Sequence, residues 1–143
     1  MRGFYTRAAL AIAILLASMT GATAASLTAR IDLSSQTMTV SQNGVVRYTW
    51  RVSSGRKGYG TPTGSWSAKW LSRHHRSRKY NNAPMPHSVF FHGGYAIHGT
   101  YEVKRLGRPA SHGCIRLAPQ NAAAFFAMVQ RNGNKNTRIV ITR

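Results

Sequence analysis

Acidic residues are almost missing from this sequence. Asp32 and Glu102 are the only carboxylate side chains among 143 residues, whereas Lys and Arg number 20, so the formal net charge is +18. Two carboxylates in the whole chain argue against catalysis by a carboxylate pair, which needs both groups at one site. A surface this basic attracts polyanions.

Cysteine is equally scarce, because Cys114 is the only one. A single thiol excludes an intramolecular disulfide framework and a Cys-rich structural zinc site. Hydrophobic residues make up 43% of the chain and charged residues only 15%. This balance supplies a core and argues against a disordered polyelectrolyte, and the length fits one domain.

No apolar run is long enough to cross a bilayer, which takes about 20 residues. The run AALAIAILLA at residues 8–17 instead follows Arg2 and Arg7 and precedes the small residues of Ala22-Thr23-Ala24. This order predicts a signal peptide at residues 1–24 and a mature domain at 25–143, with cleavage after Ala25 and an uncleaved anchor as alternatives. We therefore expect export to the periplasm or cell wall.

Export changes the meaning of the positive charge. Outside the cytoplasm the available polyanions are cell-wall polymers and lipid headgroups, so an anionic wall polymer is the expected partner and nucleic acid is not. The alternative is that the charge only keeps the protein soluble. The densest basic segment, residues 73–79, shows no heptads and no interleaved aromatic residues, and we predict an exposed loop there.

Most of the mature chain shows strand patterns. Asn43-Gly44 separates two β-type runs and predicts a hairpin, because both turn residues tolerate positive φ. One helix is predicted from Pro119 to Arg131, with an apolar stripe and a stop at Gly133. Further strands are expected at residues 29–33, 36–40, 45–52, 65–70, 89–91, 95–98 and 137–142. The fold class is therefore mainly β, a β-rich α+β domain.

The reactive residue types gather between Ile97 and Leu117. Cys114 follows His112 by two residues and His98 by sixteen. An imidazole can lower the pKa of a thiol and carry its proton, whereas a buried cysteine beside ordinary histidines would be inert. Gly113 leaves room beside Cys114, and backbone N–H groups near it could face an oxyanion. A zinc site formed by His92, His98, His112 and Cys114 would have unusual ligand spacing, and no acidic residue nearby could orient the histidines.

The segment Ser111-His112-Gly113-Cys114-Ile115-Arg116 resembles the signature of the L,D-transpeptidase catalytic domain of bacterial cell-wall enzymes. Ile97-His98-Gly99-Thr100 resembles the upstream part of that signature. Residues 32–53, 55–64 and 85–96 resemble further segments of the same domain, in the same order. Together the resemblance covers about residues 27–142.

The resemblance implies roles for individual residues. Cys114 falls at the nucleophile, His98 at its base, and Gly99 where a backbone carbonyl orients that histidine. His112 occupies a supporting position in the catalytic set, and the substrate-binding positions fall on Ser111, Gly113 and Arg116. Tyr101 and the basic residues 73–79 depart from the family pattern.

The resemblance also implies packed β-sheets with a few short helices and a cysteine acyl-enzyme mechanism. The substrate would be a peptidoglycan stem tetrapeptide, and a second stem as acceptor would give a 3→3 cross-link. Water as acceptor would make the protein an L,D-carboxypeptidase, and a lipoprotein lysine would make it an anchoring enzyme. A basic wall-binding protein without catalysis is the remote alternative. No cofactor or metal is expected, and we expect a monomer.

Overall fold

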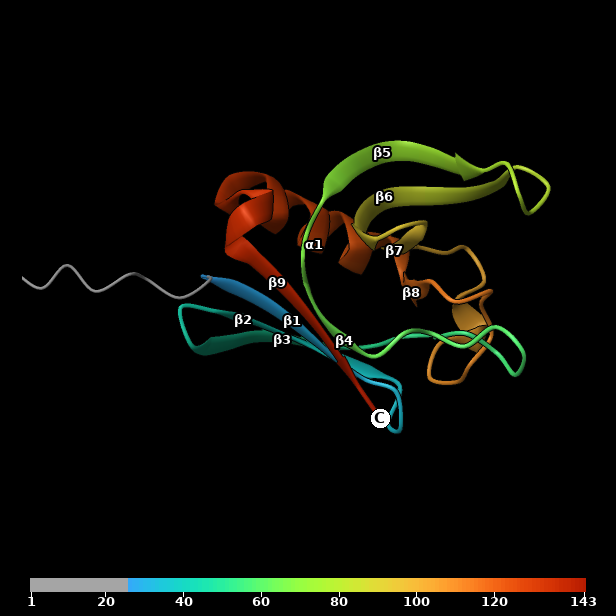
Figure 1. Cartoon of the computed structure of the whole chain (residues 1–143), viewed down its shortest axis with the longest axis horizontal. Helices are drawn as coiled ribbons and strands as arrows, with labels where there is room; N and C mark the ends of the chain where they lie inside the picture. The colour runs from blue at the N-terminus through green and yellow to red at the C-terminus, as the bar shows by residue number, and fades with distance from the viewer. Residues whose placement is uncertain (1–25) are drawn as a thin grey trace, which may run out of the picture.

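The computed structural model describes residues 26–143, so the predicted signal peptide lies outside the described part. Two sheets and one α-helix make up the architecture (Figure 1). The first sheet has five strands in the order β3-β2-β1-β9-β4, and the second has four in the order β5-β6-β7-β8. Among residues 26–143, no helix is long and apolar enough to cross a membrane.

The first sheet is built around two parallel strands from opposite ends of the described chain, β1 (Leu27–Asp32) and β9 (Thr137–Thr142). Their alternating residues are buried, because side chains on a strand point to opposite faces. β2 (Thr37–Gln42) and β3 (Val45–Arg51) form the predicted hairpin, and β4 (Gly64–Ser67) pairs with β9. Asn43 and Gly44 both have positive φ, as the Asn-Gly signal predicts.

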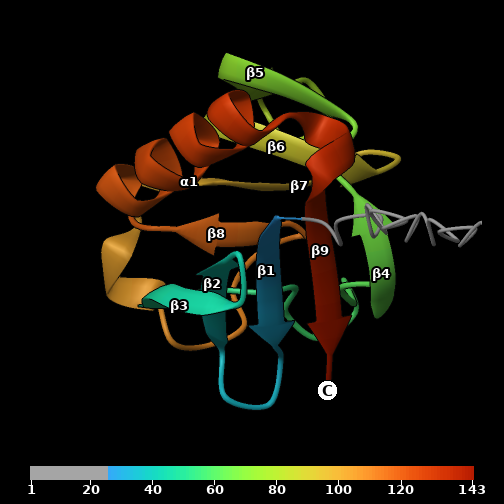
Figure 2. The ribbon, with the colours of Figure 1, turned by 90° about the vertical axis from the view of Figure 1, so that its left-hand side faces the viewer.

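The second sheet contains β5 (Trp70–Ser77), β6 (Ala83–His92), β7 (Tyr95–Gly99) and β8 (Ile115–Leu117). Helix α1 (Pro119–Asn132) packs against β6 and β7 (Figure 2). Its predicted stripe is buried, with Phe125 and Val129 in the core between helix and sheets. Short 3₁₀ helices at Val103–Arg105 and Asn134–Asn136 complete the described elements.

The prediction of a loop at residues 73–79 is wrong for all but its last two residues, although Arg73, Arg76, Arg78 and Lys79 are exposed as expected. Residues up to Ser77 belong to β5, and only the following turn, 78–82, links it to β6. The pairing partner explains the error, because β6 is much longer than the predicted strand 89–91 and begins among Pro84 and Pro86. Prolines and charged residues are untypical of strands, so the sequence of this hairpin shows no strand pattern. Pairing between the two strands stabilises them nevertheless. The predicted strand at 65–70 is likewise divided between β4 and the start of β5.

Candidate functional site

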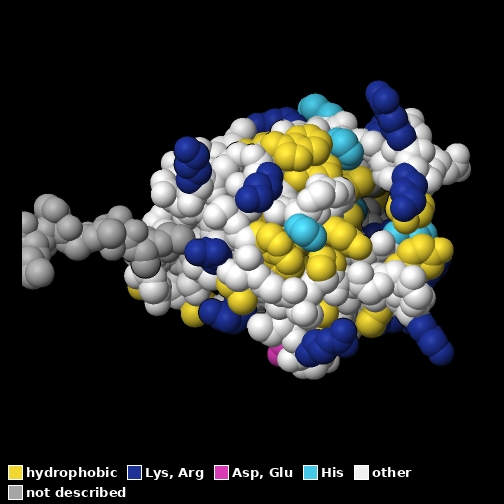
Figure 3. Space-filling view, viewed as in Figure 1, with side chains coloured by type: hydrophobic (Ala, Val, Ile, Leu, Met, Phe, Trp, Pro, Cys, Tyr) yellow, Lys and Arg dark blue, Asp and Glu magenta, His cyan; other side chains and the backbone are white. Residues whose placement is uncertain are grey.

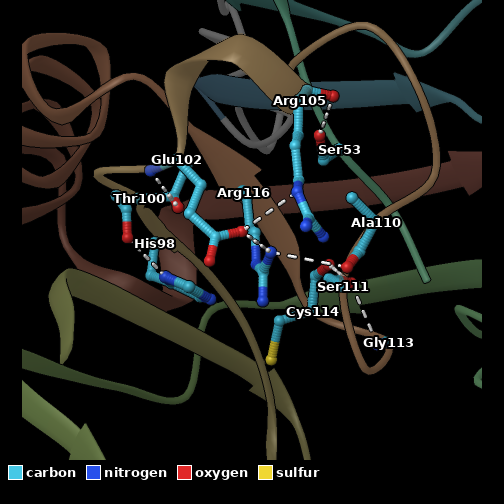
Figure 4. Close-up of polar contacts among 11 residues, drawn as sticks. Ser53, His98, Thr100, Glu102, Arg105, Ala110, Ser111, Gly113, Cys114 and Arg116 are labelled. Carbon is cyan, nitrogen blue, oxygen red and sulfur yellow. Dashed lines mark hydrogen bonds and ion pairs between the residues drawn. The ribbon is translucent and has the colours of Figure 1, made fainter. Parts of the chain in front are cut away.

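The parallel pair β7 and β8 places the reactive side chains on one face. Ile97 pairs with Ile115 and His98 with Arg116, so the two isoleucines point into the core together. Alternation along each strand sends the neighbouring side chains to the opposite face. There Cys114, His98 and Arg116 face the same cavity (Figure 4).

The cavity has a volume of about 1010 Å³ and lies between the second sheet and the long connection from β7 to β8. A space of this size holds a ligand of several residues. Cys114, His98, His112, Ser111 and Arg116 all line it, so the structure brings together the side chains that the sequence singled out. The β5–β6 hairpin forms another wall, and in Figure 1 its turn projects beyond the body of the second sheet.

His98 is buried and is held through its ring nitrogen. Nδ1 lies 2.7 Å from the carbonyl oxygen of Gly99. A carbonyl oxygen can only accept, so Nδ1 carries the hydrogen and Nε2 keeps a free lone pair. Burial lowers the pKa of His98 to about 4, against the opposing effect of the Gly99 bond. His98 is therefore a neutral imidazole at pH 7, in the tautomer that accepts a proton at Nε2.

The Cys114 thiol is partly buried beside the β6–β7 turn. Sγ donates to the Gly94 carbonyl oxygen at 3.8 Å. Burial raises the pKa of Cys114 above its ordinary value, although a backbone hydrogen bond from Ala96 and the charge of Arg116 oppose this. We expected the nearby imidazole to lower the pKa of the thiol, and this direction is wrong. A neutral imidazole supplies no charge that could stabilise a thiolate.

Residues 112–114 form a bend immediately before β8 rather than a strand. Ser111 holds this bend, because its Oγ donates to the Cys114 carbonyl oxygen at 2.6 Å and accepts the Gly113 N–H at 3.0 Å. The Gly113 N–H is therefore already engaged. Gly113 has a φ of 122°, and a Cβ there would come within 2.6 Å of the Tyr95 ring. Only glycine fits this position.

His112 does not share the environment of His98. Its ring stacks on Tyr80, with centroids 3.8 Å apart and planes 6° from parallel, and meets the edge of Tyr59 at 4.8 Å. Burial first, and then the charges of Arg56, Arg116 and Lys79, lower its pKa. His112 therefore joins the active-site bend to the β5–β6 turn.

The loop at residues 55–61 also holds this segment, through hydrogen bonds to its backbone carbonyl oxygens. Arg56 N–H donates to the Ser111 carbonyl oxygen at 3.0 Å, and Thr61 Oγ1 donates to the Gly113 carbonyl oxygen at 2.8 Å. A Cβ at Gly55 would lie 1.7 Å from the Tyr59 carbonyl oxygen, so the loop can close this tightly only with glycine. The bend that carries Cys114 is thus fixed by contacts from a segment more than fifty residues away.

Arg116 pairs with the one carboxylate of the site. Its Nη1 lies 3.4 Å from Glu102 Oε2 and 3.4 Å from the Ala110 carbonyl oxygen (Figure 4). Burial lowers the pKa of Arg116, and Glu102 opposes the shift. The sequence drew attention to neither Glu102 nor Tyr80 as a site residue. The only sequence signal for Glu102 was the scarcity of carboxylates, because a lone carboxylate in a strongly basic chain is expected to form an ion pair.

The residues weighed for zinc do not assemble as a metal site. Cys114, His112 and His98 line one cavity, but His92 stacks on Trp66 with centroids 5.2 Å apart and is not part of the lining. Within residues 26–143, no group of three His, Cys, Asp or Glu side chains is placed to hold a metal ion.

Comparison with known proteins identifies the class to which this fold and site belong. The family model of the L,D-transpeptidase catalytic domain matches residues 27–141. The chain therefore belongs to the L,D-transpeptidase catalytic domain family. None of the curated proteins compared matches the chain.

Solved structures agree with this assignment. An L,D-transpeptidase from Mycobacterium smegmatis is 24% identical with a TM-score of 0.74, over 82% of this chain and 59% of that one. An L,D-transpeptidase from Stackebrandtia nassauensis is 24% identical with a TM-score of 0.71, over 90% and 62%. One from Xylanimonas cellulosilytica is 27% identical with a TM-score of 0.68, over 86% and 63%. This chain spans about three fifths of the length of those chains. The shared fold confirms the prediction of a mainly β domain.

The lowered pKa of His98 predicts a titration far from the ordinary range of histidine. We expect the imidazole to take up its second proton with a midpoint near pH 4, because burial penalises the charged ring. NMR of ring protons across pH 3–8 measures this midpoint, and a His98→Gln variant assigns the resonance. A midpoint at the usual value of about 6.5 would contradict the buried environment described above.

Proposed function

We propose that the protein is an L,D-transpeptidase that acts on peptidoglycan stem peptides through an acyl-enzyme on Cys114. The observation that carries the proposal is the shared face of β7 and β8. It exposes a thiol and an oriented neutral imidazole to one cavity. Nucleophile, base and orienting group are the three parts that covalent acyl transfer requires. Family membership supports the substrate class.

The first half of the reaction transfers an acyl group to the enzyme. Cys114 Sγ attacks the carbonyl carbon of the third stem residue while its proton passes to His98 Nε2, so a C–S bond forms from a neutral pair. The C–N bond to the terminal D-alanine then breaks, and His98 returns the proton to the departing amine. The Gly99 carbonyl stabilises the imidazolium that exists between these steps, because its oxygen accepts the Nδ1 hydrogen.

The second half returns the thiol. The side-chain amine of another stem attacks the thioester, loses a proton to His98 Nε2 and forms a new amide, and Cys114 leaves with that proton. A second stem as acceptor gives the 3→3 cross-link that we propose. Water or a lipoprotein lysine in the same position would give the carboxypeptidase or anchoring reaction. Arg116 lines the cavity beside the nucleophile and the base, while Ser111 and Gly113 hold the bend that carries Cys114.

Export follows from the same proposal, because the substrate lies outside the cytoplasmic membrane. The N-terminal pattern of the sequence supports delivery to the periplasm or cell wall. The excess of positive charge favours attraction to anionic wall polymers.

Intact-mass measurement tests the nucleophile. Incubation with a synthetic stem tetrapeptide should add the acyl tripeptide to the protein, and digestion should place it on Cys114. Cys114→Ala should show no adduct and form no cross-linked product, while its thermal unfolding stays close to that of the parent. Product masses identify the acceptor, as linked stems or as free tripeptide. Unchanged cross-linking by Cys114→Ala would contradict the proposal.

The two histidines should differ in their effect on acylation. His98→Ala removes the general base and should slow acylation by at least about 10²-fold. His112→Ala should slow acylation less, because the His112 ring packs between Tyr59 and Tyr80 and is not the proposed base. His92→Ala is the control, since that ring lies against Trp66 outside the cavity. Single-turnover acylation rates give the order, and a larger loss at His112 would move the base to that residue.

A further inference from the structure

The wall of the cavity carries an excess of positive charge. Arg76, Arg78 and Lys79 contribute to it from the β5–β6 hairpin, and Arg116 contributes from β8. Glu102 is the one carboxylate residue among the lining residues. A cavity with walls of one sign concentrates ligands of the other sign.

That carboxylate is already neutralised by other cations. Glu102 Oε2 lies 3.4 Å from Arg116 Nη1 and 3.6 Å from Arg105 Nε. Within residues 26–143 these are the only ion pairs, so Arg76, Arg78 and Lys79 have no carboxylate partner there. Their charge is available to a ligand in the cavity.

The hairpin that bears these cations is held at the site. Tyr80, in the turn, stacks on His112 at 3.8 Å, and Lys79 Nζ lies 5.4 Å from the centre of the Tyr80 ring. Arg76 Nη1 donates to the Asn82 carbonyl oxygen at 3.2 Å and so braces the turn. The charge of Lys79 contributes to lowering the pKa of His112, which agrees with its position close to the active-site bend.

The same cavity has an apolar side. Trp70 and Phe90 stack with centroids 3.8 Å apart, and Met85 lies beside them in the lining. Figure 3 shows Lys and Arg side chains next to histidine and hydrophobic side chains around a hollow on the right-hand side of the molecule. Such a cavity fits a peptide that carries both aliphatic segments and carboxylates.

We infer that Arg76, Arg78 and Lys79 determine specificity by selecting acidic peptides, namely stem peptides with free carboxylates over stem peptides whose carboxylates are amidated. The inference rests on the proposed function for the identity of the substrate. A stem tetrapeptide carries carboxylates on its isoglutamyl and diamino-acid residues, and amidation removes these charges with little change in size. The two forms therefore differ for this cavity mainly in charge.

The geometry favours this role over a wall tether for the basic segment. Its residues do not act as one surface patch, because Arg73 lies over the Phe126 ring of α1, at 5.2 Å, and is not part of the cavity lining. Residues 76–79 instead line the cavity that contains Cys114. A tether would need the charges to face outward together.

Binding measurements separate recognition from turnover. The full chain with Cys114→Ala is titrated calorimetrically with two synthetic stem tetrapeptides, one with free carboxylates and one with its isoglutamyl and diamino-acid carboxylates amidated. The hairpin variant adds R76Q, R78Q and K79Q. The matched control adds R30Q, R47Q and K135Q, which remove the same charge from exposed positions outside the cavity.

The inference predicts that the parent binds the free-carboxylate peptide at least about 10-fold more tightly than the amidated one. The hairpin variant should lose most of this preference by weakening only the free-carboxylate complex, and the control should keep it. Lys79→Gln alone should weaken binding of the free-carboxylate peptide by about 2–3-fold, as expected for one exposed charge pair. This single variant tests the inference if the triple variant does not fold.

Three results would overturn the inference. Equal affinity of the parent for both peptides would show that the cavity does not read carboxylates. Equal losses on both peptides in the hairpin variant would show that the hairpin acts through shape. Weaker binding to intact sacculi with unchanged binding to both peptides would assign the cations to a wall polymer. Selective binding by a protein whose wild-type Cys114 never becomes acylated would instead contradict the proposed function alone.

Discussion

The hydrogen bond from His98 Nδ1 to the Gly99 carbonyl, 2.7 Å long, is the contact on which the account of the site depends. It fixes the tautomer of a buried ring and so decides which nitrogen can take a proton. In a triad this orientation comes from a carboxylate, and the chain has only two. A backbone carbonyl performs the same task without adding a charge. The imidazole and the thiol can therefore both rest in their neutral forms.

The rest of the fold keeps that pair in place. β7 and β8 bring His98 and Arg116 into register, and α1 covers the strands from the core side. The loop at residues 55–61 and the Ser111 hydroxyl then hold the bend that carries Cys114. These contacts join segments far apart in the chain. The geometry of the site is thus a product of the whole domain rather than of the Ser-His-Gly-Cys segment.

Charge is distributed around this neutral pair with a clear asymmetry. Arg116 has a carboxylate partner in Glu102, whereas the hairpin cations have none within residues 26–143. The protein therefore presents an uncharged nucleophile inside a cationic cavity. This arrangement keeps the acylation chemistry separate from the recognition of an anionic substrate.

Sequence patterns were sufficient where structure is local. The Asn-Gly turn, the stripe of α1 and the final strand follow from turn chemistry and periodicity, and the motif residues do line one cavity. The β5 strand was missed because its partner, rather than its own composition, stabilises it. Tyr80 was missed for the same reason, since only tertiary packing brings it onto His112. The direction of the Cys114 pKa shift could not be predicted, because it depends on the burial of the thiol, which the spacing of residues in the sequence does not reveal.

The ionisation of Cys114 in the resting protein tests the central claim most directly. Its measure is the rate of alkylation by iodoacetamide between pH 5 and 10, followed by intact mass in the wild type and in His98→Gln. The account predicts an alkylation midpoint above the ordinary thiol pKa of about 8.5, nearly the same in both proteins, because a neutral imidazole does not stabilise the thiolate. A midpoint below pH 7 that rises on removal of His98 would show a resting thiolate–imidazolium pair and contradict the account.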